Sequence, residues 1–169
     1  MSRAPLLRIP VGAVVERVKS TSQWIDYLWR PVAVLPGEPE TTPWTRLSDD
    51  GERATFFAGS ADIALYPTET GAYRDNLATG SPALWVVLRP TETDPPYRLF
   101  TVTADPSEGE AMTEAGNDLV ETVPMPEPIR AAIEAFIAEH HQEHVFHKRK
   151  RDRANPEALG RRDPRGERR

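Results

Sequence analysis

Over its first two thirds, the chain alternates between hydrophobic and polar positions in short segments, with the two-residue period of β-strands. Prolines, glycines and Asp-Gly pairs separate these segments and supply turns. The segments that we expect to form strands are 10–19, 24–35, 44–47, 54–57, 62–66, 83–89, 97–103 and 119–123. The Asp50-Gly51 pair predicts a hairpin between the third and fourth of them, and the continuous apolar run of the sixth predicts a central strand.

Three further segments follow a helical pattern. Residues 68–80 are expected to form one or two helical turns that end at a glycine. Residues 106–116 are expected to form a short helix with Asp105 as its cap and a proline at its first position. The last helix opens at Pro128, and its apolar stripe consists of Ile129, Ala132, Ile133, Phe136 and Ile137.

Short strands followed by a helix with one apolar face predict an α+β fold. We expect mainly antiparallel β-structure that forms a small barrel or half-barrel, covered by the C-terminal helix. This single domain is placed at residues 8–146. Apolar side chains almost vanish after it, so residues 147–169 are expected to form a disordered basic tail.

Composition limits the chemistry and the location of the protein. The 169 residues include no cysteine, which excludes disulfides, thiolate metal ligands and a cysteine nucleophile. The first apolar run is short and broken by Pro10, whereas a membrane-spanning helix needs about 20 apolar residues. We therefore expect a cytoplasmic protein with neither a signal peptide nor a membrane span.

Charge is distributed unevenly along the chain. Residues 148–169 carry ten Lys/Arg and four Asp/Glu, a net +6, whereas residues 1–147 have a net charge of −11. Such a division of charge indicates separate roles for body and tail. A basic tail can bind phosphates, but this one has no aromatic residue after Phe146 on which bases would stack. Docking onto an acidic protein surface therefore explains the tail better than nucleic-acid binding does.

Four histidines, at positions 140, 141, 144 and 147, stand at the expected end of the last helix. Three of them, His140, His144 and His147, would share one helical face, and imidazoles at i and i+4 can share a zinc ion. The metalloprotease order His-Glu-x-x-His is absent, and the apolar stripe projects onto this same face. We interpret the rings as a continuation of the buried stripe and expect neither a metal nor a cofactor; metal binding and a pH-sensitive patch are the alternatives.

No catalytic motif stands out. Residues 68–77 gather carboxylates and an arginine, which can form an acid–base site but more often cap a helix. A phosphate-binding glycine loop and a G-x-S-x-G motif are both absent. We assign no catalytic residue and expect a non-enzymatic protein.

Aromatic and basic side chains supply the candidate contacts of a binding surface, since tryptophan, tyrosine and arginine are enriched in interfaces. Of the four tryptophans, all placed on expected strands, Trp85 is interpreted as core. The candidate partner-binding residues are Trp24, Arg30, Trp44, Tyr73 and Arg74 on the body and Lys148, Arg149, Lys150 and Arg151 on the tail.

Several segments together resemble a small bacterial family, domain-of-unknown-function family 3305. They are IPVGAVVER (9–17), WRPVAVLPG (29–37), TETGAYRDNL (68–77), PALWVVLR (82–89), VETVPMPE (120–127) and HKRKR (147–151). Genes of this family tend to lie beside those for molybdenum-dependent formate dehydrogenases. The resemblance therefore implies a role in the assembly, maturation or regulation of such an enzyme, with its subunits or maturation factors as partners.

Two hypotheses of different classes follow. The first is a non-enzymatic accessory protein that docks on an acidic protein partner through its basic arm. The alternative is a small-molecule binding protein or enzyme that handles a molybdopterin-type precursor. In that case, an anionic ligand would be held at the barrel mouth by Arg30, Arg74 and Arg89.

Overall fold

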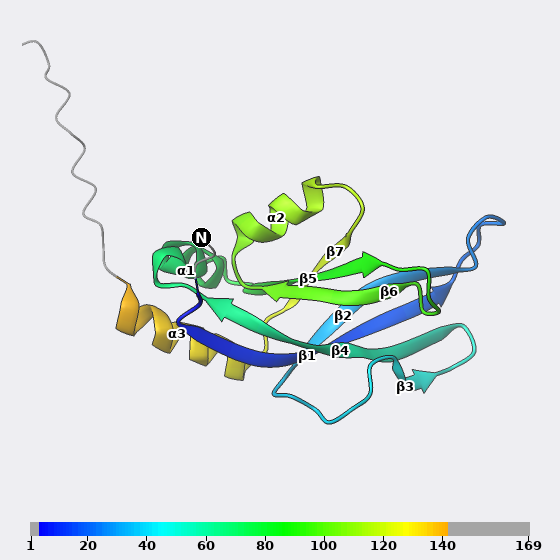
Figure 1. Ribbon diagram of the computed structural model, residues 1–169, viewed down its shortest axis with the longest axis horizontal. Coiled ribbons are helices and arrows are strands. Elements are labelled where there is room, and N and C mark those ends of the chain that lie inside the picture. Colours follow the sequence, from blue (N-terminus) through cyan, green and yellow to red (C-terminus); the bar gives the residue numbers. More distant parts are fainter. Residues whose placement is uncertain (1–3, 142–169) are drawn as a thin grey trace, which may run out of the picture.

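The computed structural model describes residues 4–141, which form seven strands and three α-helices (Figure 1). The strands are β1 (Leu7–Lys19), β2 (Tyr27–Pro36), β3 (Thr45–Asp49), β4 (Arg53–Leu65), β5 (Ala83–Pro90), β6 (Tyr97–Thr103) and β7 (Leu119–Pro124). The helices are the 3-10 turn η1 (Pro67–Glu69), α1 (Thr70–Ala78), α2 (Pro106–Glu114) and α3 (Glu127–His140).

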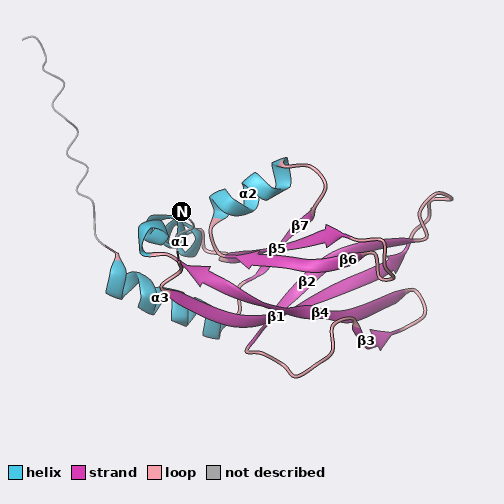
Figure 2. Cartoon of the chain, in the orientation of Figure 1, coloured by secondary structure: helices cyan, strands magenta, loops and turns pink. Residues whose placement is uncertain are grey.

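The strands form two antiparallel sheets, with the orders β2-β1-β4-β3 and β6-β5-β7. Figure 2 shows the two sheets facing one another, with β4 against β6 and β2 against β7. Within the described residues no strand pairing joins one sheet to the other, so the barrel is not closed. The predicted α+β class with mainly antiparallel strands is confirmed. The strands form two sheets that face one another rather than a closed barrel.

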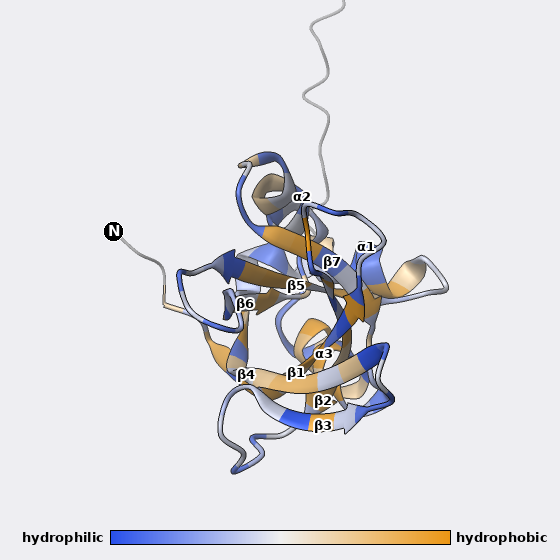
Figure 3. Ribbon diagram, turned by 90° about the vertical axis from the view of Figure 1, so that its right-hand side faces the viewer, coloured by the Kyte–Doolittle hydropathy of each residue, from blue (hydrophilic) through white to orange (hydrophobic). Residues whose placement is uncertain are grey.

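Helix α3 closes one end of this sandwich. Its buried residues Ile129, Ile133 and Phe136 join the core, as the apolar stripe predicts. Figure 3, seen from the opposite end, shows the apolar helix α3 behind the two facing sheets. The β1–β2 loop and the β3–β4 turn extend beyond the sheets at that opposite end (Figure 1).

Strand β4 corrects the prediction of two short strands at 54–57 and 62–66. The chain continues through one strand because a β-bulge absorbs the irregularity between them. Val14 of β1 pairs with Phe57, and Ala13 pairs with Gly59, so Ala58 is the extra residue. Gly59 has a φ of 146°, a backbone conformation that residues with a Cβ rarely adopt.

The remaining elements match the sequence pattern closely. Strand β5 is central in its sheet, and β3 and β4 form the hairpin predicted from Asp50-Gly51. At the start of α2, the Asp105 side chain accepts a hydrogen bond from the Ser107 N–H at 2.9 Å, and Pro106 follows the cap. Trp85, predicted as core, is only partly buried: it lies against Gly109 of this helix, on the face of β5 opposite to the core residues Leu84 and Val86.

Candidate functional site

Trp24 is the most exposed of the predicted contact residues, at 90%. It lies in the loop between β1 and β2 rather than on a strand, which corrects the prediction of a strand from residue 24. The reason is that serine hydroxyls bind the loop backbone in place of strand pairing. Ser20 Oγ accepts from the Ser22 N–H at 3.0 Å, and Ser22 Oγ accepts from the Trp24 N–H at 3.2 Å.

The end of the sandwich opposite α3 carries a cluster of aromatic rings, which we call the mouth. Trp29 is at its centre, with ring centroids 5.9 Å from Trp44, 5.7 Å from Phe56 and 6.4 Å from Tyr97. The rings come from β2, β4, β6 and the segment before β3, so both sheets contribute. Most of these pairs meet edge to face, a geometry that aromatic quadrupoles favour.

Arg17 of β1 belongs to the same mouth. Its guanidinium carbon lies 4.3 Å from the ring centroid of Tyr27, 5.2 Å from Phe56 and 5.8 Å from Trp29. The pairing of β1 with β2 sets Arg17 directly opposite Trp29, and the two-residue period of β1 places it in line with Val15 of the core. The mouth therefore contains a guanidinium group that makes cation–π contacts with three rings at the edge of the hydrophobic core.

Trp44 takes part in the mouth at a conformational cost. Its φ is 67°, in the left-handed region that bulky residues seldom occupy. The ring packs against Trp29 and Phe56, and the Trp44 N–H donates to the Phe57 carbonyl. Trp44 was predicted on a strand and as an exposed contact; it precedes β3 and is partly buried.

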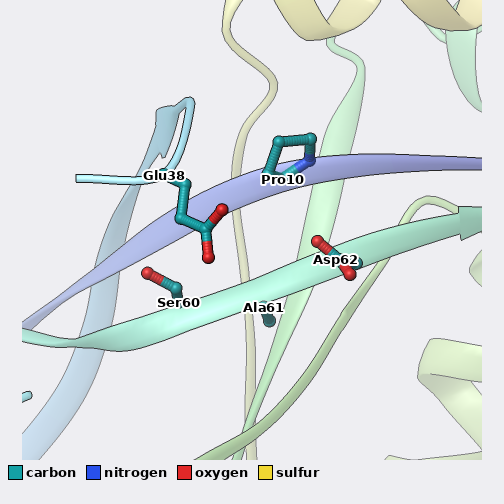
Figure 4. A pocket seen from close by; sticks show the side chains of 5 residues that line it. All are labelled: Pro10, Glu38, Ser60, Ala61 and Asp62. Atoms are coloured by element: carbon teal, nitrogen blue, oxygen red, sulfur yellow. The ribbon is translucent and has the colours of Figure 1, made fainter. Parts of the chain in front are cut away.

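Two of the hollows on the described surface are shallow and open to solvent. One, of about 280 Å³, adjoins the mouth and is lined by Lys19, Ser20, Ser22, Ile25, Asp26 and Tyr27. The other, of about 130 Å³, is lined by Pro10, Glu38, Ser60, Ala61 and Asp62 (Figure 4). The second hollow holds two carboxylates and no cation, so its lining does not suit an anionic ligand.

The arginines of the small-molecule alternative do not line either hollow. Arg30 donates a hydrogen bond to the Glu16 carboxylate at 3.2 Å. Arg89 forms a bidentate ion pair with the Asp118 carboxylate, at 3.2 and 3.1 Å. The Arg89 guanidinium carbon also lies 3.5 Å from the centroid of the Phe100 ring, and the hydrogen bonds that Arg89 donates to Asp118 raise its pKa. Both guanidinium groups therefore bind carboxylates of the protein itself.

Tyr73 was predicted as a surface contact, and the structure instead buries it. Its side chain is 2% exposed, its ring packs against Phe136, and its hydroxyl accepts from the Tyr66 N–H at 3.0 Å. Residues one turn apart on α1 face the core, which explains why Tyr73 and Asn76 are both buried. Arg74 follows on the exposed face, where its Nη1 lies 3.3 Å from His141 Nε2.

Carboxylates gather at the junction of α1 and α2. Burial raises the pKa of Glu108, and Thr103 Oγ1 donates to its carboxylate at 3.2 Å. Asp105 acts as the cap of α2, so its side chain already has a partner. Both carboxylates thus support the fold locally.

The two described histidines at the end of α3 make different contacts. The His140 ring lies 4.7 Å from the Phe136 ring, which confirms that it extends the apolar stripe. His141 is the C-cap residue, and its Nδ1 lies 2.9 Å from Thr70 Oγ1 of α1. His144, His147 and the candidate contacts Lys148, Arg149, Lys150 and Arg151 lie outside the described residues, as does the tail predicted at 147–169.

Sequence reasoning missed five residues of the mouth: Arg17, Tyr27, Trp29, Phe56 and Tyr97. An arginine after a run of valines gives no sign that three rings from two other strands will surround it. One signal was available, because Arg17, Lys19, Tyr27 and Trp29 alternate on two strands joined by a short loop. Registering those two strands would have placed the four side chains on one face.

Comparison with known proteins gives one match. A family model described as "Protein of unknown function (DUF3305)" matches residues 10–150. No curated protein and no solved structure matches the chain. Within the described residues, no helix combines the length and apolar character needed to cross a membrane.

Proposed function

The chain belongs to the family of proteins of unknown function DUF3305, and we propose that it is a non-enzymatic accessory protein whose mouth and β1–β2 loop bind a protein partner. The observation that carries this proposal is the position of Trp24. A tryptophan that is 90% exposed at the tip of a loop contributes nothing to the core. In an interface, the same side chain can bury a large apolar area.

The loop supports the proposal because its backbone is already ordered. Besides the two serine hydrogen bonds, the Ser20 N–H donates to the Asp26 carbonyl at 3.0 Å and closes the loop. Ile25 and Leu28 are 51% and 55% exposed, so Trp24 does not stand alone. A loop that is ordered before binding loses less conformational entropy when the partner arrives.

The partner that we propose is a subunit or maturation factor of a molybdenum-dependent formate dehydrogenase, the class that the sequence resemblance implies. The basic residues 148–151 would add long-range attraction to an acidic partner and raise the association rate. The proposed location is the cytoplasm, a reducing compartment that suits a chain without cysteine. The alternative of a molybdopterin-type ligand has less support, because Arg30 and Arg89, two of its three arginines, are paired with carboxylates.

The test is capture of partners from the native host with full-length protein, at low and at high salt, followed by mass spectrometry. We expect formate dehydrogenase subunits or maturation factors at low salt and less of them at high salt. With the purified partner, Trp24→Ala should weaken binding by at least about tenfold, as the loss of an interface tryptophan does. Truncation after His147 should slow association.

The matched control is Leu47→Ala, which removes an exposed apolar side chain from β3. It should leave the affinity unchanged, because Leu47 lies outside the β1–β2 loop. Equal binding by wild type and Trp24→Ala would disprove the proposed surface. Recovery of the bait alone, under every salt condition, would disprove the accessory role.

A further inference from the structure

Most arginines that ring contacts or ion pairs hold in this fold have a carboxylate partner. Arg17 does not, and neither does Arg98, which lies 5.6 Å from the Phe100 ring alone. Arg30 and Arg53 bind Glu16, Arg89 binds Asp118, and Arg46 binds Asp49, each within 3.2 Å. Among the described residues, no carboxylate lies within ion-pair distance of Arg17, whose charge is met only by rings. The three rings lie around the guanidinium carbon, and its N–H donors have no acceptor among the described residues.

Those donors face water. No buried side-chain nitrogen or oxygen in the described part of the chain lacks a hydrogen-bond partner. The guanidinium nitrogens of Arg17 have no protein acceptor, so they are accessible to solvent at the mouth. The planar fork of donors of a solvent-accessible guanidinium matches the geometry of a carboxylate.

Lys19 supplies a second cation beside it. Arg17 and Lys19 are separated by one residue on β1, so their side chains leave the same face roughly 7 Å apart. Lys19 also has no ion-pair partner among the described residues, and it lines the hollow that adjoins the mouth. The Asp26 carboxylate lines this hollow too and would repel an anion there. We therefore expect the anion to bind Lys19 on the side that faces Arg17.

We propose that Arg17 and Lys19 bind two acidic side chains of an extended segment of the partner. This inference rests on the proposed function and names the chemistry that the mouth recognises. In an extended segment, residues i and i+2 also point the same way at about 7 Å, so a Glu-x-Glu or Asp-x-Asp sequence matches the spacing of the two cations. The exposed Trp24 loop next to them would cover apolar groups of the same partner.

A free phosphate is the other anion that a guanidinium fork can bind, and geometry favours the peptide. Aromatic rings pack against one another in the mouth and leave little space for a ligand between them; they belong to Trp29, Trp44, Phe56 and Tyr97. The hollow that adjoins the mouth is open to solvent, which suits a macromolecule better than an enclosed small ion. Inorganic phosphate therefore serves as a competing probe.

The experiment is an NMR titration of the full-length protein, read at the Arg17 Nε–Hε and the Trp29 indole N–H. The probes are the capped peptides Ac-Glu-Ala-Glu-NH₂ and Ac-Gln-Ala-Gln-NH₂, and inorganic phosphate. We expect saturable shifts with the acidic peptide and an affinity at least about tenfold lower for the neutral peptide, because the charge-assisted hydrogen bonds are lost. Phosphate should bind more weakly than the acidic peptide.

Two variants make the result specific. Arg17→Gln should lose the acidic-peptide response, and Arg17→Lys should keep the charge but bind more weakly because the fork is gone. The control Arg46→Gln removes an arginine that also lies near Phe56 but is paired with Asp49, and it should not change binding. Unfolding midpoints of all variants would show whether Arg17→Gln remains folded.

Three results would overturn the inference: equal responses to the two peptides, an undiminished response in folded Arg17→Gln, or tighter binding of phosphate than of the acidic peptide. The titration needs no partner, so its outcome is separate from that of the proposed function. If Trp24→Ala abolished partner capture while the acidic peptide failed to bind, only the role of Arg17 and Lys19 would be wrong.

Discussion

Asn76 and Ala83 bind one another through both ends of the Asn76 side-chain amide. The amide nitrogen donates to the Ala83 carbonyl at 2.8 Å, and the amide oxygen accepts from the Ala83 N–H at 3.1 Å. The same nitrogen donates to the Ala104 carbonyl at 3.0 Å. One buried side chain thus ties α1 to the start of β5 and to the end of β6.

Replacing this amide should destabilise the fold severely. Asn76→Ala removes three hydrogen bonds and leaves buried backbone groups without partners, for which we expect a loss of about 2–4 kcal/mol in the free energy of unfolding. Urea denaturation measures it. Asn117→Ala, at an exposed position before β7, is the control and should change the free energy by less than about 0.5 kcal/mol. Similar values for the two variants would contradict this account of Asn76.

Gly109 in the middle of α2 gives a prediction in which two effects oppose one another. Alanine is favoured over glycine in a helix by about 1 kcal/mol. A Cβ at this position, however, would collide with the Trp85 ring, against which the helix backbone packs. Overpacking of this kind costs about 1–3 kcal/mol, so Gly109→Ala should lower the thermal midpoint.

Gly71 of α1 is the matched control for that substitution. It is also helical, has an ordinary φ, and no atom lies within 4 Å of the position that its Cβ would take. Gly71→Ala should therefore be neutral or stabilise by up to about 1 kcal/mol. If both glycine variants shifted the midpoint in the same direction, close packing on Trp85 would not be the deciding factor.

The sequence predicted the elements well because local signals fix them. Asp50-Gly51 makes its hairpin, Asp105 and Pro106 start their helix, and the stripe from Ile129 places α3 on the core. Predictions failed where a choice depends on distant residues. Strand β4 continues past Ala58 because β1 accommodates a bulge there, and that arrangement is invisible in residues 54–66 alone.

The candidate site was harder to predict for the same reason. Trp24 is a correct candidate for exposure, but Tyr73 has a similar aromatic character and lies inside. Only the packing of α1 against α3 distinguishes the two. The enclosure of Arg17 needs the register of β1 with β2 and the approach of the second sheet, which no short motif encodes.

The Tyr73 phenol should make stability depend on alkaline pH. Burial raises its pKa from 10.0 to about 12. The unfolded chain therefore loses this proton at a lower pH than the native state, so the contribution is complete below pH 10 and falls as the pH rises towards 12. Between pH 9 and pH 11 the expected loss is about 1.4 kcal/mol, the equivalent of one pKa unit.

The control for this prediction is Tyr73→Phe, which cannot ionise and also loses the hydrogen bond from the Tyr66 N–H. At pH 9 the variant should be less stable than the wild type by about 1 kcal/mol. The difference should shrink or reverse at pH 11, because only the wild type is affected by Tyr73 ionisation. A difference that is constant across this range would show that burial does not shift this phenol.

Glu16 is the buried member of an ion-pair triad on the outer face of the first sheet. Its side chain is 8% exposed, and it binds Arg53 at 2.8 Å and Arg30 at 3.2 Å, both of which are well exposed. Removing one arginine leaves the other in place, so Arg30→Ala or Arg53→Ala alone should cost about 1 kcal/mol or less. The double variant leaves a buried carboxylate without a partner and should cost about 3 kcal/mol or more, beyond the sum of the two.

A third substitution decides whether the unpaired charge is the cause. Glu16→Met in the double-variant background replaces the carboxylate by an apolar side chain of similar volume and should recover most of the lost stability. Arg46→Ala, which breaks the exposed pair with Asp49, is the control and should cost about 0.5 kcal/mol or less. Additive losses for Arg30 and Arg53, with no recovery by Glu16→Met, would mean that the two arginines stabilise the sheet by packing rather than by charge.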